Sequence, residues 1–167
     1  MQIPKTAATA LLATLLIMPG MSLAEDVVSV KRIGMELARD IANAAVDACR
    51  ERGYQVSAVV VDRTGFEQAI LRDTHANRFT VQIAREKANS VVLSRTASGV
   101  FKKNRADIRE EMNHVDGILM LRGALPIESA GSMIGAIGVS GAHGGDIDEA
   151  CAREALDSVA DRLAFAD

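Results

Sequence analysis

The sequence predicts an α+β fold in which an antiparallel sheet of about five strands is flanked by helices. Two observations lead to this prediction. Segments with apolar residues at helical spacing lie near both ends of the chain, and the β-branched segments between them are joined by short, glycine-containing turns. Short turns join antiparallel strands, whereas parallel strands need long crossover connections. Helices at both ends of a set of hairpin-linked strands are typical of the α+β class.

The N-terminal residues 1–24 have the three parts of a secretory signal peptide. Lys5 is the only charged residue among them, the segment Ala7–Met18 is apolar, and Ser22–Ala24 offers small residues for cleavage. The apolar run is shorter than the roughly 20 residues that cross a bilayer. We therefore expect export to the periplasm or the cell exterior, with a retained N-terminal anchor as the alternative. Residues 25–167 then form a single domain.

Each further element has a local reason. Apolar residues at every third or fourth position predict helices, β-branched runs predict strands, and Asp, Gly and Pro mark turns. Gly53 ends the first helix, and Pro126 confines its strand to a sheet edge. The expected elements are a helix at Met35–Arg52, strands at Val56–Val61 and Phe66–Arg72, a helix at Phe79–Ser94, an irregular segment at Thr96–Val115 with a short helix at Asp107–Met112, strands at Gly117–Arg122, Gly123–Ile127 and Ser132–Ser140, and a helix at Asp146–Leu163.

Glycines recur at every third residue from Gly135 to Gly144. No lysine follows them as a P-loop requires, and the acidic residues that do follow would repel a phosphate at the helix start. Asp146 and Glu149 have the spacing of a capping-box variant, so we expect these carboxylates to start the helix. Glycines on both faces of a strand predict close packing on both sides. A helix would pack on one side, and a second subunit or a flat ligand on the other.

Composition excludes some function classes and leaves the cysteines open. A net charge of −3 without a basic tract argues against a nucleic-acid partner, and one Tyr, four Phe and no Trp argue against a base-stacking platform. Cys49 and Cys151 fall on the first and last predicted helices. In an exported chain they form a disulfide, or else they are two buried thiols.

Several motifs resemble those of the small haem-binding HbpS-like proteins, which include GlcG-type proteins and the C-terminal domain of PduO-type cobalamin adenosyltransferases. The most specific is the strand "GAIGVSG" followed by a glycine loop and "DEACA". The others are "ILMLRGALPI", the hairpin "AVVVDRTG" and the helix "IAREKA". Together they span Glu36 to Val159. The sequence departs from the family pattern at Arg122 and Ala124, which interrupt a proline and glycine pair, and at His143, where proline is frequent.

The resemblance implies a profilin-like domain, assembly into homo-oligomers that are often octamers, and haem as the cofactor. An exported protein of this kind would sequester or transfer haem, with any haem degradation being slow, and a membrane sensor would be a further partner. The alternative is a small-molecule enzyme, or an accessory binding protein, of an organic-acid catabolic pathway. Whether the protein is an enzyme stays open at this point.

Haem iron takes His, Met, Cys or Tyr as axial ligand, and the chain has no C-x-x-C-H motif for covalent attachment. His114 is the first candidate for the iron, because it ends the irregular segment, and Met112, two residues away, could be a second ligand. His75 and His143 lie in loops, where an imidazole can equally be solvated. Cations for the propionates are Arg78, Arg85 and Lys87, unless these form a solvated helix face.

Two other kinds of chemistry are weaker alternatives. A metal without haem could use His114 with Asp116, or His143 with Asp146 and Asp148. An acid–base enzyme could use His114 or His143 with a neighbouring Asp.

Overall fold

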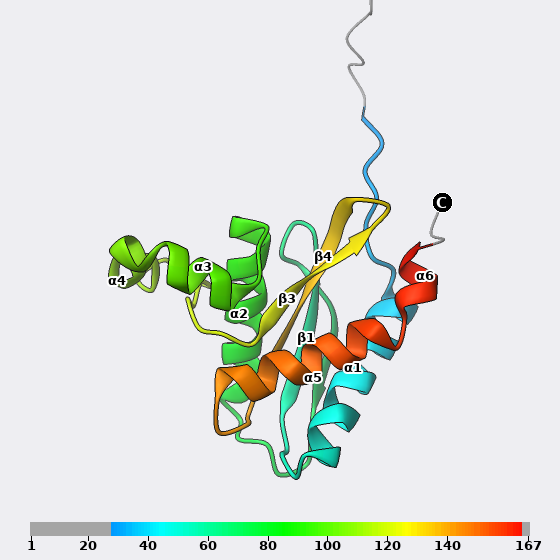
Figure 1. Ribbon diagram of the computed structural model, residues 1–167, viewed down its shortest axis with the longest axis horizontal. Helices are drawn as coiled ribbons and strands as arrows, with labels where there is room; N and C mark the ends of the chain where they lie inside the picture. Colours follow the sequence, from blue (N-terminus) through cyan, green and yellow to red (C-terminus); the bar gives the residue numbers. More distant parts are fainter. Residues whose placement is uncertain (1–27, 165–167) are drawn as a thin grey trace, which may run out of the picture.

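The computed structural model describes residues 28–164, so the expected signal peptide lies outside the described residues. Helices and an antiparallel sheet confirm the α+β class (Figure 1). In chain order the elements are α1 (Met35–Glu51), β1 (Ser57–Asp62), β2 (Glu67–Arg72), α2 (Thr80–Ser94), α3 (Ser98–Asn104), the 3-10 helix η1 (Ala106–Ile108), α4 (Arg109–Met112), β3 (Ala124–Ser129), β4 (Ser132–Ser140), α5 (Gly145–Asp157) and α6 (Ala160–Ala164). No helix between residues 28 and 164 is both long and apolar enough to cross a membrane.

The sheet has the strand order β2-β1-β4-β3, and every neighbouring pair is antiparallel. Helices cover both faces. Side chains such as Val60 and Ile137 pack against α1 and α5, whereas Val59 and Ala136 pack against α2. Because successive strand residues point to opposite faces, these two sets define a three-layer molecule with α1 and α5 on one side and α2 on the other.

The predicted close packing around the glycines of β4 occurs within the chain itself. A Cβ atom at Gly138 would collide with the backbone of Ala84 in α2. A Cβ at Gly135 would collide with the Val61 carbonyl of β1 and, on the opposite face of the sheet, would meet Ile33 of the segment before α1. That segment is fixed to β4 by a hydrogen bond from the Ile33 N–H to the Ile134 carbonyl (3.1 Å). These glycines therefore serve helix and segment packing, and the flat ligand or second subunit is not needed to explain them.

Three element predictions differ from the structure. Gly117–Arg122 is not a strand, because its backbone bonds to side chains and to the Glu86 carbonyl of α2 instead of to a neighbouring strand. Ser90 donates to the Leu119 carbonyl (2.8 Å), and Asn89 donates to the Gly117 carbonyl (3.1 Å). The irregular segment contains α3 in addition to the expected short helix. The last helix is interrupted after Asp157 and resumes as α6.

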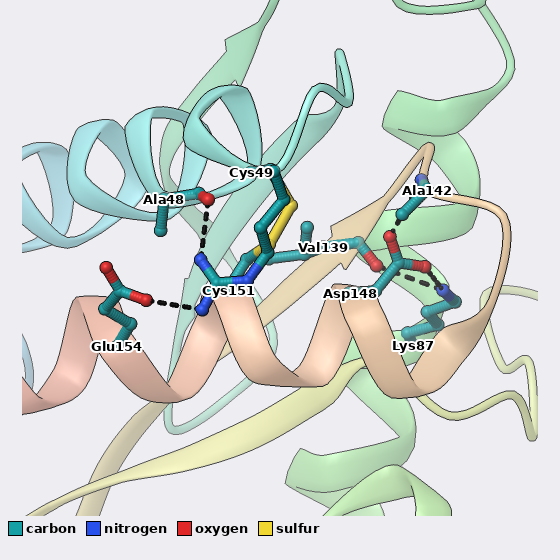
Figure 2. Close-up of a disulfide and its surroundings, with 9 residues drawn as sticks. Ala48, Cys49, Lys87, Val139, Ala142, Asp148, Cys151 and Glu154 are labelled. Atoms are coloured by element: carbon teal, nitrogen blue, oxygen red, sulfur yellow. Dashed lines mark hydrogen bonds and ion pairs between the residues drawn. A yellow bond between two sulfur atoms is a disulfide. The ribbon is translucent and has the colours of Figure 1, made fainter.

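The two cysteines form a disulfide that joins α1 to α5 (Figure 2). Both sulfur-bearing residues are fully buried in the core shared by α1, α5 and the sheet. The bond closes a loop with a sequence separation of 102 residues. The structure therefore contains the disulfide and not the alternative of two buried thiols.

A buried ion pair joins α5 to α2, the helix on the opposite face of the sheet (Figure 2). The Lys87 ammonium donates to Asp148 Oδ2 (2.8 Å) and to the Val139 carbonyl (3.0 Å), and Asp148 Oδ1 accepts the Ala142 N–H (3.1 Å). Lys87 is 3% exposed and Asp148 is also 3% exposed. Burial raises the pKa of Asp148 above its usual range, although Lys87 opposes this shift. A side chain at Gly123 would fall on the ammonium and on Asp148.

The expected role of the α5 carboxylates as a helix cap is wrong. The N-cap residue is Gly144, and it makes no side-chain capping bond. Asp148 pairs with Lys87 instead, and Glu149 accepts two hydrogen bonds from Arg122 (3.0 and 3.1 Å). Lys87 is likewise no part of a solvated helix face, and its contact with Asp148 leaves it unavailable for a propionate.

Breaking the disulfide should destabilise the protein. We expect the Cys49→Ser, Cys151→Ser double variant to lose about 2–5 kcal/mol of unfolding free energy, since the bond restricts a long loop in the unfolded chain. Urea unfolding with and without reductant measures this, and the double variant is the control because reductant should leave it unchanged. Two titratable thiols in the unreduced, denatured wild type would show that the bond is not formed.

The ion pair should behave as a buried pair. Lys87→Met and Asp148→Asn should each cost about 3–5 kcal/mol, because each leaves a buried polar group without its partner, and the double variant should cost less than the sum. Arg105→Ala, at an exposed pair with Asp107, is the control and should cost at most about 1 kcal/mol. If the losses of unfolding free energy in the two single variants add up to the loss in the double variant, Lys87 and Asp148 are not coupled.

The loss of unfolding free energy that Lys87→Met causes should also depend on pH. Without Lys87, the folded-state pKa of Asp148 lies still further above its unfolded value, so stability is retained at acidic pH and lost as pH rises through the folded pKa. The difference in unfolding free energy between the wild type and Lys87→Met should therefore be smaller at about pH 4 than at pH 7. An unchanged or larger deficit at the lower pH would refute the assignment.

Candidate functional site

A concave, mostly apolar surface lies between the end of α2 and the arm formed by α3, η1 and α4. We call it the arm groove. Its volume is about 520 Å³, within the range of small-molecule sites. The arm projects from the layered body of the molecule in Figure 1. The residues that line it are Leu93, Ser94, Thr96, Phe101, Asn104, Arg105, Ile108 and Met112.

Apolar side chains form most of the groove. Leu93 comes from α2, Phe101 from α3 and Ile108 from η1, and the thioether of Met112 completes the wall from α4. At the α2 end, the Ser94 and Thr96 hydroxyls bond to each other (3.2 Å). A flat apolar ligand with a few polar substituents suits such a surface.

A charged pair stands at the arm side of the groove. Arg105 lines it and donates to both carboxylate oxygens of Asp107 (3.1 and 3.2 Å). The hydrogen bond from Arg105 lowers the pKa of Asp107 and raises that of Arg105. Both side chains are exposed, so the guanidinium can exchange this partner for an anionic group of a ligand at small cost.

Of the residues predicted from sequence, Met112 lines the arm groove and the histidines do not. His114 follows α4, where its N–H donates to the Glu111 carbonyl (3.1 Å), and its side chain is exposed. His114 thus lies close along the chain to the groove, two residues beyond Met112, while the groove wall itself is thioether and hydrocarbon.

His75 and His143 lie together at the opposite end of the sheet, next to the segment that leads into β1. The His75 N–H donates to the Gln55 side chain (2.8 Å). His143 packs edge-on against Tyr54, with ring centroids 5.4 Å apart. Both histidines are exposed. The structure therefore separates these two imidazoles from the arm groove.

The predicted propionate cations have other partners. The Arg78 guanidinium lies over the Phe79 ring, 4.2 Å from its centroid. Arg85 pairs with Glu67 of β2, and Lys87 pairs with Asp148. The cation nearest to a ligand in the groove is instead Arg105, which the sequence analysis did not select.

The metal alternatives do not assemble. Among residues 28–164, no three His, Cys, Asp or Glu side chains are grouped so as to hold a metal ion. His143 cannot share a metal with Asp148, because both oxygens of Asp148 are engaged by Lys87 and the Ala142 N–H. Near His75, the carboxylate of Asp73 is held by Arg50 (2.7 and 3.0 Å), which lowers the pKa of Asp73 and keeps it from acting as a base.

Sequence reasoning missed most of the groove, although a signal was present. Phe101, Ile108 and Met112 recur at intervals of seven and four residues, which is helical spacing for one apolar face. The polar run around Lys102 and Lys103 and the break at Arg105 masked this pattern.

Comparisons with known proteins were consistent with this fold. The family described as "Haem degrading protein HbpS-like" matches residues 33–157. A crystal structure of HbpS is 30% identical in sequence, with a TM-score of 0.75, and the match covers 80% of this chain and 94% of HbpS. The Klebsiella pneumoniae protein ORFY is 26% identical, with a TM-score of 0.76 and coverage of 83% and 98%.

Two further solved structures are similar to this chain. A double mutant of HbpS from Streptomyces reticuli is 30% identical, with a TM-score of 0.76 and coverage of 85% and 97%. The PduOC haem complex shares the fold, at 21% identity and a TM-score of 0.66, over 76% of this chain and 94% of that one. No curated protein sequence matches the chain. The match over residues 33–157 and the similarity to HbpS together show that this chain belongs to the HbpS-like family.

Proposed function

We propose that the protein binds haem in the arm groove. The observation that carries this proposal is the groove itself, an apolar surface of about 520 Å³ with a thioether in its wall and an arginine at its side. A porphyrin offers two apolar faces and carboxylate substituents, which match Phe101, Ile108 and Arg105. Membership of a family described as haem-degrading, and a structural relative solved as a haem complex, support the same ligand.

The residues present have the chemistry that haem requires. The thioether of Met112 in the groove wall would hold the iron, and His114, two residues further along the chain, would be a second donor. Leu93 and Phe101 would exclude water from the faces of the macrocycle. The Arg105 guanidinium would release the Asp107 carboxylate and bind a propionate in its place. When bound, haem would supply the redox-active iron; the chain's own part is to hold and shield it.

We further propose that the protein is exported and sequesters or transfers haem. The signal-peptide pattern of residues 1–24 and the Cys49–Cys151 disulfide support an oxidising compartment such as the periplasm or the cell exterior. Homo-oligomers belong to the same proposal, which the exposed apolar side chains of Phe66 (69%) and Ile70 (45%) at the edge strand β2 support. A membrane sensor is the transfer partner that an exported carrier could reach.

Hemin titration tests the proposal, with the Soret band as readout. Phe101→Ala and Met112→Ala should each weaken binding by about tenfold, because each removes apolar contact area from the groove. Met112→Leu keeps the apolar wall and removes the sulfur, so it should shift the Soret band more than it changes affinity. His114→Ala reports the contribution of the second donor.

His75→Ala and His143→Ala are the matched controls, since both histidines are exposed and lie away from the groove. They should bind hemin as the wild type does. Absence of a Soret shift in the wild type would refute haem binding, and a loss confined to the two control variants would refute the arm groove as its place.

A further inference from the structure

A second pocket, separate from the arm groove, is lined by two arginines. It lies at the end of the sheet that is uppermost in Figure 1, between the β1–β2 turn, the end of α2 and the β3–β4 hairpin. Its volume is about 260 Å³, which suits a small ligand. We call it the arginine pocket; its lining residues are Arg63, Val92, Arg95, Glu128, Gly131, Ser132 and Met133.

The two guanidinium groups are unusual in this chain because they have no partner. Arginines elsewhere in residues 28–164 mostly form ion pairs, while Arg72 donates to backbone carbonyls and Arg78 lies over a ring. Among the arginines of that range, only Arg63, Arg95 and Arg109 have a side chain with no hydrogen-bond, ion-pair or ring partner. Two of these three line the same pocket.

The backbone holds one of these arginines in an unfavourable conformation. Arg95 ends α2 with φ 55° and ψ 24°, in the left-handed region where glycine is usual. A residue with a Cβ atom costs about 1 kcal/mol there. Folding alone would favour glycine at this position, whereas arginine places a guanidinium at the pocket.

The charges of the lining define the ligand. Arg63 and Arg95 contribute two positive charges and Glu128 one negative charge, and no ion pair closes between them. The lining is therefore net positive by one charge and matches a monoanion. Arginine binds carboxylates through paired hydrogen bonds, and the Ser132 hydroxyl adds a further donor. We infer that the arginine pocket binds a single carboxylate group of a small-molecule ligand.

The carboxylate could come from a free acid or from a propionate of a porphyrin, and one experiment distinguishes these sources. In the first arm, the porphyrin-free protein is titrated with sodium propionate and followed by amide NMR shifts, with sodium chloride as the ionic-strength control and inorganic phosphate as a more highly charged anion. In the second arm, hemin and hemin dimethyl ester are titrated into the same proteins. The first arm does not depend on haem binding, so its result is independent of the function proposed above.

Arg63→Ala and Arg95→Gly are the test variants, and Arg109→Ala is the matched control. Glycine suits the backbone at residue 95, so Arg95→Gly should fold at least as stably as the wild type while it removes the guanidinium. Propionate should shift the amides around residues 63, 95 and 132 in a saturable way. Both test variants should weaken this binding by about 10- to 100-fold, and Arg109→Ala should not.

Two other outcomes are equally decisive. If propionate does not bind, but esterification and both test substitutions weaken hemin binding, the carboxylate in the pocket belongs to the porphyrin. If propionate gives no saturable shift, and hemin and its ester bind the wild type and the variants alike, the inference is wrong. An equal loss of binding in Arg109→Ala would also overturn it, because the binding would then depend on the overall charge of the protein and not on this pocket.

Discussion

The contact between Lys87 and Asp148 fixes the relation between the two faces of the molecule. Lys87 belongs to α2 and Asp148 to α5, and the sheet separates these helices. Two charges taken out of water are tolerated only when their remaining hydrogen bonds are satisfied, and here the Val139 carbonyl and the Ala142 N–H satisfy them. The disulfide fixes α5 to α1 from the other side. Since α2 carries a wall of the arm groove and a wall of the arginine pocket at its far end, the position of both sites depends on this contact.

The layered fold could be predicted because local patterns determine it. Helical spacing around Ile41 and β-branching in Val59 and Val60 are properties of short segments, and both gave elements close to those observed. Gly117–Arg122 was misassigned for a reason that is not local. Its apolar residues resemble a strand, but its backbone bonds to the Asn89 and Ser90 side chains and to the Glu86 carbonyl, all in α2 and distant in sequence. The partner of Lys87 was hidden in the same way, since 61 residues separate it from Asp148.

The functional residues show a similar division. Met112 was a candidate from its type and its place in the chain, and the structure puts it in the groove. Residue type alone could not exclude His75 and His143, which lie away from the groove because β2 and β4 both end beside the start of β1. Arg63 and Arg95 have no partner in the folded chain, and no sequence pattern predicts this. Sequence thus identified the family, whereas the proposed binding places come from the packing of α2 against the hairpins and the arm.

The central claim is that haem binds between α2 and the arm. Hydrogen–deuterium exchange of the intact protein, with and without hemin, tests it most directly because it reports location without substitution. Ligand contacts slow local opening, so amides in residues 93–96 and 98–112 should exchange more slowly with hemin, while those in residues 54–56 and 141–144 should not change. Protection confined to the latter segments, next to His75 and His143, would contradict the account.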